Sequence, residues 1–308
     1  MKNIYKITLG IASAAVLLSS CNSVLEEHPK TIFTPDFFTT QLGVEGGVTA
    51  LYSHLRWIGG QAYYYNSLET GTDEFTYGES ADGNFKDADL SGAGSLNAST
   101  ARSDALWGTA FTFINTASGI ISNAEAVGLA PAVIAEAKFM RAYDYFLLVQ
   151  TFGGVALDLG SGELEFNSSS VRVSTRNTVP EVYTKAIFPD LKFGIENLPD
   201  NSRLTGTVTK NVARLFLAKA YLTYAWWLEN PNGIDTYPAT SKRDKSQAQA
   251  YFQKAKTVAD QAIAENEAVD KDGNPIVNAE VEVASPFIEL MNKIKTTINS
   301  SSLKAGTP

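Results

Sequence analysis

The side chains best suited to chemistry in this sequence are aromatic rings and amides in one long stretch without helical periodicity. Residues 59–102 are rich in Gly, Ser and Asp, and a loop of this length inside a compact domain is usually functional or disordered. Flat aromatic faces suit the apolar C–H face of a pyranose, while an amide both donates to and accepts from sugar hydroxyls. We therefore predict glycan-binding residues at Tyr64, Tyr77, Phe85 and Asn97. The same loop also carries Tyr63, Tyr65, Asn66, Phe75 and Asn84. The alternative is that these rings only fold the loop onto the helices.

The sequence contains few residues that could act in catalysis. Hydrolysis of a glycosidic bond needs two carboxyl groups that face each other across the sugar. Asp73, Glu74 and Glu79 share the loop, but neighbouring acids in a polar loop are usually solvated. A nucleophilic triad needs a histidine or an equivalent base, and the only histidines are His28 and His54. We therefore predict no catalytic residue and no enzyme.

Metal and cofactor motifs are equally scarce. One cysteine and two histidines without paired spacing do not make a zinc site. Residues 270–274 (DKDGN) begin like a calcium loop, but Pro275 and Val281 stand where an EF-hand needs glycine and a bidentate glutamate. Neither a dinucleotide-binding GxGxxG motif nor a phosphate-binding Walker loop occurs. We predict no metal site and no cofactor, with a calcium ion bound elsewhere left open.

Composition and charge match an ordinary globular protein. The 308 residues are 44% hydrophobic and 19% charged, which excludes disordered and fibrous classes. The formal net charge is −8, from 25 Lys and Arg against 33 Asp and Glu. Nucleic-acid binding needs a face rich in Lys and Arg, and adhesion to anionic lipid needs a polybasic patch. The charge argues against both partners and favours a neutral or cationic ligand.

The first twenty residues have the pattern of an export leader. Lys2 and Lys6 precede an apolar run at 7–18, which is too short to span a bilayer as a helix. The segment Leu18-Ser19-Ser20-Cys21 resembles a bacterial lipobox, in which the cysteine is acylated and becomes the mature N-terminus. We predict a leader at 1–20, lipidation at Cys21 and an extended tether at 21–35. A plain secretory signal with an incidental cysteine is the alternative.

Apolar residues at three- and four-residue steps predict helices over most of the remaining chain. Helices are expected at 36–57, 103–126, 131–152, 178–198, 209–228 and 246–265, with a last one at 287–298. The buried face of the first would be formed by Phe37, Leu42, Val48, Leu51, Tyr52 and Leu55. Residues 153–178 and 229–245 are expected to be loops, and 270–283 a short hairpin.

Internal repetition indicates how these helices pack. The helix pair at 135–152 and 179–198 has the same plan as the pair at 212–227 and 247–264. Each second helix carries a tyrosine and an alanine three or four residues apart, Tyr183 with Ala186 and Tyr251 with Ala255. Small residues let two helices approach closely, as in tetratricopeptide repeats. We predict an all-α fold of tetratricopeptide-like helical pairs with long irregular loop insertions. An unrelated helical bundle is the alternative.

Several large or charged side chains are expected to be structural. Trp57 and Trp107 lie on apolar helical faces and should belong to the core. Trp226 and Trp227 end a helix and would lie at a rim or partner contact. Glu136 and Arg141 should form ion pairs with the adjacent helix rather than bind a ligand.

The chain resembles the SusD/RagB family of outer-membrane lipoproteins of Bacteroidota in several of these segments. The most specific match is residues 135–146 (AEAKFMRAYDYF) followed by 152–157 (FGGVAL). The opening resembles the family's lipid cysteine, acidic residue, proline and paired aromatics. The helix at 103–126 resembles its tryptophan–isoleucine–asparagine helix. The residues that carry these two matches are Cys21, Leu25, Glu26, Pro29, Phe37, Phe38, Trp107, Ile114 and Asn115.

The resemblance implies a helical-repeat domain over 36–308 and a cell-surface lipoprotein that binds oligosaccharide or polysaccharide. Such proteins deliver glycan to a SusC-like TonB-dependent outer-membrane transporter in polysaccharide utilisation. The membrane would be contacted through the lipid anchor only. Lys138 and Ala156 depart from the family's usual arginine and proline, and the chain is shorter than typical members. It is therefore either a fragment or a member that lacks part of the ligand platform.

Three other functions remain open from the sequence. The protein would be a helical scaffold that contacts only the transporter, a surface glycosidase, or a truncated product without function. The first predicts co-purification with a large outer-membrane barrel and no glycan binding. The second predicts release of reducing ends.

Overall fold

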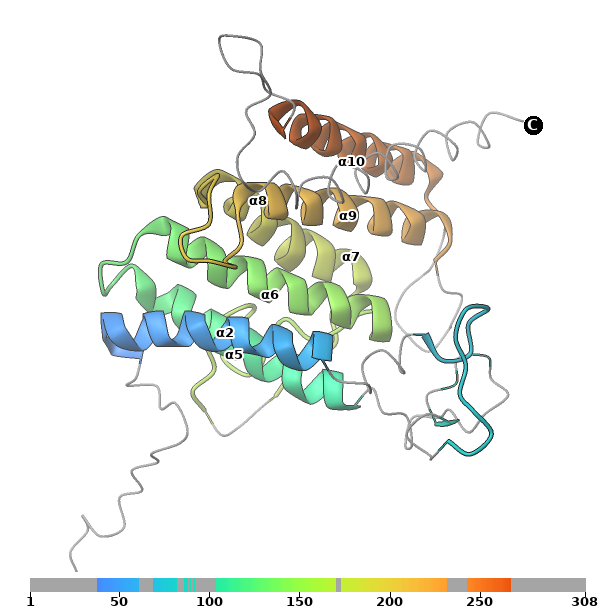
Figure 1. Ribbon diagram of the computed structural model, residues 1–308, viewed down its shortest axis with the longest axis horizontal. Helices are drawn as coiled ribbons and strands as arrows, with labels where there is room; N and C mark the ends of the chain where they lie inside the picture. Colours follow the sequence, from blue (N-terminus) through green and yellow to red (C-terminus); the bar gives the residue numbers. More distant parts are fainter. Residues whose placement is uncertain are drawn as a thin grey trace, which may run out of the picture. The chain divides into compact units, whose positions relative to one another are not determined.

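The protein is all-α in the part that the structure describes. The computed structural model describes residues 38–60, 69–81, 86, 87, 89, 91, 104–169, 173–231 and 243–266. These residues form helices and loops and no β-strand, apart from an isolated antiparallel bridge between Asp158 and Glu163. The helices are α2 (Gln41–Gly60), α5 (Asp104–Ala124), α6 (Pro131–Phe152), α7 (Val179–Glu181), the π-helix η3 (Val182–Ile187), α8 (Phe188–Asn197), α9 (Lys210–Glu229) and α10 (Lys245–Asn266). The predicted fold class is confirmed (Figure 1).

Each helix packs against the next one along the chain, in the order α2, α5, α6, α8, α9 and α10 (Figure 1). Contacts across each boundary run in opposite directions. On α5 and α6, for example, Ser118 meets Arg141 and Trp107 meets Phe152. Successive neighbours are therefore antiparallel. The predicted pairs at 135–152 with 179–198 and at 212–227 with 247–264 are both formed, by α6 with η3 and α8 and by α9 with α10.

Aromatic rings and small residues fill the contact between the two pairs. Tyr183 lies 4.8 Å from Tyr224, and Phe188 stacks on Tyr251 at 5.4 Å between ring centroids. Ala186 and Ala255 are fully buried, as the repeated tyrosine–alanine pattern predicts. Gly194 of α8 faces Ala213 of α9 so closely that an added Cβ would lie 3.3 Å from the alanine methyl. Small residues thus set the helix spacing, and the rings fill the layer beside them.

The first helix begins later than predicted. Residues 38–39 form a short 3₁₀ turn, and α2 starts at Gln41 because the Thr40 hydroxyl accepts the Gly43 N–H at 3.1 Å, as an N-cap does. The buried face includes Val44, Val48, Leu51 and His54. Leu42, which was predicted to belong to that face, is 80% exposed. This part of the prediction is wrong because Leu42 lies two, six and nine residues before Val44, Val48 and Leu51, which at about 100° per residue places it on the opposite side of the helix.

The helix expected at 178–198 is continuous but changes its winding. Thr178 and Glu181 form a capping box that begins α7. Six residues of π-helix follow, in which the Phe188 N–H donates to the Tyr183 carbonyl, five residues back. Pro189 lacks an N–H, and its ring would clash with the carbonyl of residue 185 in a regular α-helix. The wider π turn accommodates that proline.

Two glycines end α6 and return the chain onto the stack. Gly153 has a φ of +73°, which L side chains rarely adopt, and its N–H donates to Val149. At Gly154 an added Cβ would lie 2.1 Å from the carbonyl oxygen of Asn177. The Asn177 side-chain oxygen accepts the Leu157 N–H, and the backbone N–H of Asn177 donates to the Val155 carbonyl. The glycine pair therefore stops the helix and permits this close crossing.

Candidate functional site

The described part of the long loop forms a short, internally bonded turn that presents an aromatic ring. The Gly71 N–H donates to the Phe75 carbonyl at 2.9 Å. The Thr72 hydroxyl donates to Glu69 at 2.8 Å and accepts the Phe75 N–H at 3.2 Å. Phe75 at the end of this turn is 43% exposed. Because these bonds fix the backbone of the turn, the exposed ring loses little conformational freedom when a ligand binds.

A buried carboxylate ties the second part of this loop together. Asp89 is 4% exposed and accepts the Ser91 N–H at 2.9 Å. Hydrogen bonds from the Ser91 hydroxyl, the Ser91 N–H and the Tyr77 hydroxyl lower the pKa of Asp89. Tyr77 is half-buried. Its hydroxyl therefore has a structural partner, and only part of its ring remains available to a ligand.

The other predicted site residues cannot be compared with the structure. Tyr64, Phe85, Asn97 and Cys21 lie outside the described residues. Phe75, which the sequence analysis noted in the loop without selecting it, is the more exposed of the two described rings. A sequence signal for this existed. Asp73, Glu74 and Thr76 flank Phe75 and are exposed, and a ring between such neighbours is expected to face solvent.

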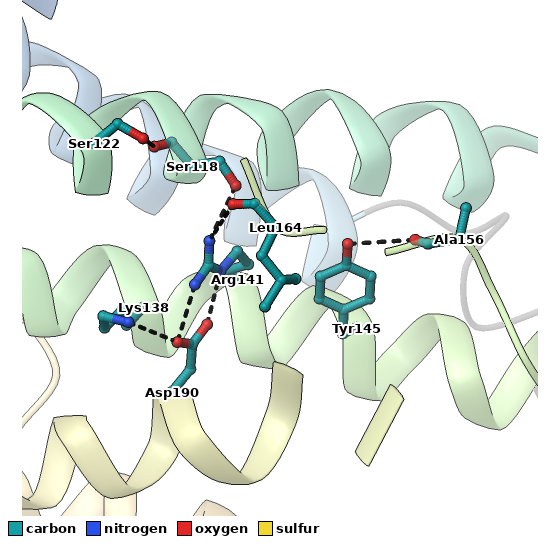
Figure 2. A network of polar contacts seen from close by, with 8 residues as sticks. All are labelled: Ser118, Ser122, Lys138, Arg141, Tyr145, Ala156, Leu164 and Asp190. Carbon is teal, nitrogen blue, oxygen red and sulfur yellow. Dashed lines mark hydrogen bonds and ion pairs between the residues drawn. The ribbon is translucent and has the colours of Figure 1, made fainter. Parts of the chain in front are cut away.

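The stack behind the loop is joined by a buried ionic network, which Figure 2 shows. Arg141 on α6 holds Asp190 on α8 through two bonds, Nε to Oδ2 at 2.7 Å and Nη2 to Oδ1 at 3.0 Å. Its Nη1 donates to the Ser118 hydroxyl on α5 and to the Leu164 carbonyl. Lys138 adds a third bond to Asp190 at 3.0 Å. Arg141 and Asp190 are 4% and 2% exposed, so this network joins three helices and is closed to ligands. The structural role predicted for Arg141 is confirmed.

Glu136 forms a second structural ion pair, whose partner lies in a loop and not on a helix. The prediction placed its partner on the adjacent helix. Its carboxylate instead accepts from Arg203, in the loop after α8, with Nε to Oε1 at 2.7 Å. Tyr52 of α2 accepts the Val208 N–H of the same loop at 3.0 Å and is hydrogen-bonded to Glu136. Burial raises the pKa of Tyr52. The group fastens the connection between α8 and α9 to α2 and α6.

His54 and Asp144 form a buried pair that sequence reasoning missed. His54 Nε2 lies 2.8 Å from Asp144 Oδ1, and the imidazole stacks on Phe113 at 4.0 Å between ring centroids. Burial raises the pKa of Asp144 to about 6, and the bond to His54 partly opposes the shift. The side chains are 3% and 2% exposed, so no substrate reaches them. The pair is therefore a structural contact between α2 and α6.

No candidate metal centre is present in the part of the chain that the structure describes, where no three His, Cys, Asp or Glu side chains converge. The segment at 270–281, which was rejected as an EF-hand, lies outside the described residues, as do the hairpin expected at 270–283 and the helix expected at 287–298. Among the helices of the described ranges, none combines the length and hydrophobicity that crossing a bilayer requires.

One of the tryptophans is placed differently from the prediction. Trp107 was assigned to the core but is 39% exposed. It lies on the same face of α5 as the buried Ala110, Phe111 and Ile114, but in the first turn, at the end of the described stack. Trp226 is 42% exposed near the end of α9, which agrees with a position at a rim. The side chain of Trp57 is outside the described part.

The antiparallel pairs α6–α8 and α9–α10, with alanines and tyrosines at their contacts, define a helical-repeat protein of the tetratricopeptide type. The model of the SusD-like family described as "Starch-binding associating with outer membrane" matches residues 61–222, which is more than half of the chain. The protein belongs to this SusD-like family.

Individual relatives agree with this assignment. The chain is 28% identical over 229 residues to SusD-like protein P2 of Formosa agariphila, which covers 71% of this chain and 43% of the relative. It superposes with a TM-score of 0.53 on a SusD superfamily protein from Parabacteroides distasonis (20% identity, 73% of this chain, 46% of the other). Surface glycan-binding protein A from Bacteroides uniformis gives 0.52 (18% identity, 75% and 48%). The chain thus spans less than half the length of these relatives.

Proposed function

We propose that this protein is a non-catalytic glycan-binding lipoprotein of the outer membrane that faces the cell surface. Its role would be to hold an oligosaccharide until a SusC-like TonB-dependent transporter takes it. The family description as starch-binding and outer-membrane-associated supports the class of ligand and the location. The Bacteroides uniformis relative is named for surface glycan binding. The described histidine, His54, is buried with Asp144 and cannot contact a ligand.

The observation that carries the proposal is the exposed ring of Phe75 on its bonded turn. An aromatic face of this kind can cover the apolar side of a sugar ring, while nearby loop residues bond its hydroxyls. Loops on a rigid scaffold are the usual place for such contacts. The turn lies within the residues that the family model matches. Tyr64, Phe85 and Asn97 remain predicted contacts of the same loop, beside the half-buried Tyr77.

The test is affinity electrophoresis of the purified protein in gels that contain soluble starch, laminarin or xylan. Phe75→Ala is expected to weaken binding of the retained glycan five- to tenfold, since removing a stacking ring costs about 1 kcal/mol. Leu204→Ala is the matched control, because Leu204 is also an exposed apolar side chain (57%) but lies in the loop between α8 and α9. Unchanged migration of the wild-type protein across the whole panel would contradict glycan binding.

The anchor and the partner need separate experiments. Labelled palmitate should incorporate into the wild-type protein and not into Cys21→Ala, because stable anchoring requires acyl chains on that residue. Co-purification with a large outer-membrane barrel protein would support the transporter partner. If that protein co-purifies while no glycan binds, the scaffold function is favoured instead.

A further inference from the structure

Trp107 is an exposed indole held firmly in one orientation. Its ring lies 4.8 Å from Phe111 and 5.1 Å from Phe152, and both contacts are edge-to-face, with interplanar angles of 63° and 89°. Phe111 is buried on α5, and Phe152 is the last residue of α6. The two rings fix the indole from different helices, yet 39% of Trp107 remains exposed. No described residue is hydrogen-bonded to its indole N–H. The exposed side chain thus offers both an apolar surface and a free donor.

The antiparallel packing places this indole at the same end of the helices as the candidate loop. His54 of α2 contacts Phe113 of α5, whereas Gly47 faces Ile120, so the two helices run in opposite directions. The last turn of α2, the first turn of α5 and the last turn of α6 therefore share one end (Figure 1). The loop at 61–103 joins α2 to α5 at that end. Trp107 follows the loop by only a few residues.

The surroundings of Trp107 fit a sugar ring better than a protein partner. A stable protein interface covers about 800 Å² on each partner, whereas a single tryptophan contributes at most about 250 Å². The other exposed large apolar residues of the described chain are scattered along it: Leu42, Phe75, Val173, Leu204 and Trp226. Asp104 is the only charged residue of α5. At Gly108, the residue after Trp107, an added Cβ would meet no atom within 4 Å. The exposed part of the indole is therefore small, with one acidic residue, Asp104, one turn before it on α5.

We propose that Trp107 is a second carbohydrate contact, which stacks on a sugar residue of the same chain that contacts Phe75. This rests on the proposed function. The indole would cover the C–H face of a neutral sugar, and its N–H would donate to a ring or hydroxyl oxygen. The bracing by Phe111 and Phe152 means that little side-chain freedom is lost on binding. Two such contacts on one end of the stack favour an extended glycan over a monosaccharide.

The test compares Trp107→Ala with Trp226→Ala in the same starch, laminarin and xylan gels. Both residues are exposed tryptophans of similar accessibility, but Trp226 is on α9, and α6 and α8 lie between it and α5. Trp107→Ala is expected to weaken binding of the retained polysaccharide five- to tenfold, and Trp226→Ala less than twofold. Equal effects of the two substitutions, or no effect of Trp107→Ala, would overturn the inference while glycan binding by the wild-type protein stands.

A second measurement separates loss of a contact from loss of folding. Trp107→Phe keeps a ring against Phe111 and Phe152 and should fold like the wild type, with binding between that of wild type and Trp107→Ala. Calorimetric titration with maltoheptaose, laminariheptaose and xylohexaose, each against its trisaccharide, gives the dependence on chain length. Trp107→Ala should reduce the advantage of the longer chain. An unchanged advantage would overturn the second contact, and absence of binding by the wild type to every probe would instead contradict the proposed function.

Discussion

The helical stack and the loop at 69–91 differ in the burial and pairing of their charged side chains. In the stack, Arg141, Asp190 and Glu136 are almost fully buried, and each is held by an oppositely charged partner. In the loop, Asp73, Glu74 and Glu79 are exposed, and their side chains form no ion pair with other described residues. The buried loop carboxylate, Asp89, is held by hydrogen bonds from Ser91 and Tyr77. A buried charge contributes to stability only with its partner in place, whereas a solvated one mainly sets the local potential. Substitutions in the stack should therefore change folding, and those in the loop should change ligand choice.

The largest effect is expected from breaking the Arg141–Asp190 pair. Asp190→Ala leaves the guanidinium and Lys138 without their shared carboxylate in a buried position, which costs about 3–5 kcal/mol. Urea denaturation followed by circular dichroism measures the free energy of unfolding. Asp200→Ala is the control, since its pair with Lys210 is exposed and should contribute less than about 0.5 kcal/mol. Similar losses in both variants would contradict the contrast between buried and exposed charges.

The next effect is a pH dependence from Asp144. Its pKa is about 6 in the folded protein, against an ordinary value of 3.8 for an aspartate. The folded state therefore holds its proton more tightly, and the contribution of Asp144 to stability rises as pH falls from 7 towards 4. The gain is at most about 3 kcal/mol, from about 1.4 kcal/mol per pKa unit. Unfolding of wild type and Asp144→Asn at several pH values isolates this contribution. A difference between them that does not vary with pH would exclude it.

A smaller loss of about 1–3 kcal/mol is expected for Gly154→Ala, because the new methyl group would displace the Asn177 carbonyl. Thermal unfolding should show a lower Tm. Gly78→Ala in the loop is the matched control, since an added Cβ there meets nothing within 4 Å. A Tm of Gly154→Ala equal to that of the control would mean that the chain around Asn177 shifts to accommodate the methyl group.

The smallest effect on stability is expected in the loop. Tyr77→Phe removes one hydrogen bond to Asp89 and should lower global stability by less than about 1 kcal/mol. Amide hydrogen exchange should become faster within the loop and remain unchanged in α6. Faster exchange in α6 would show that the loop and the stack are more tightly coupled than their contacts indicate.

Replacing the exposed loop carboxylates tests whether the loop charges affect ligand binding and leave stability unchanged. Asp73→Asn with Glu74→Gln should leave the Tm unchanged and relieve repulsion of polyanionic glycans such as alginate. The expected gain is about twofold in affinity at low salt, and it should vanish at about 1 M salt because exposed charges are screened. A gain for neutral laminarin of the same size would argue against an electrostatic cause.

Periodicity predicted the helices and their pairing well, because the buried residues of α5, α9 and α10 repeat with the period of the helix, although α6 is buried on nearly every side. The ionic role of Arg141 also followed from its place in an apolar helix. Leu42 was assigned to the wrong face of α2, opposite Val44 and Leu51, whereas the start of α2 and the exposure of Trp107 did not follow from periodicity. The stripe pattern indicates which side of a helix faces its neighbours, but not where along its length the neighbours end. The pairs of His54 with Asp144 and of Glu136 with Arg203 join residues 90 and 67 positions apart, a separation at which local patterns carry no information.

The reversal of direction at every helix has an evolutionary consequence. The connections after α2, α6 and α9 all leave from one end of the stack and return to it. Lengthening any of them adds recognition surface without shifting the register of a single buried side chain. Relatives that use different nutrients can therefore diverge at this end while selection for foldability acts on the rest. Insertions should be tolerated there far more often than in the tight link between α5 and α6.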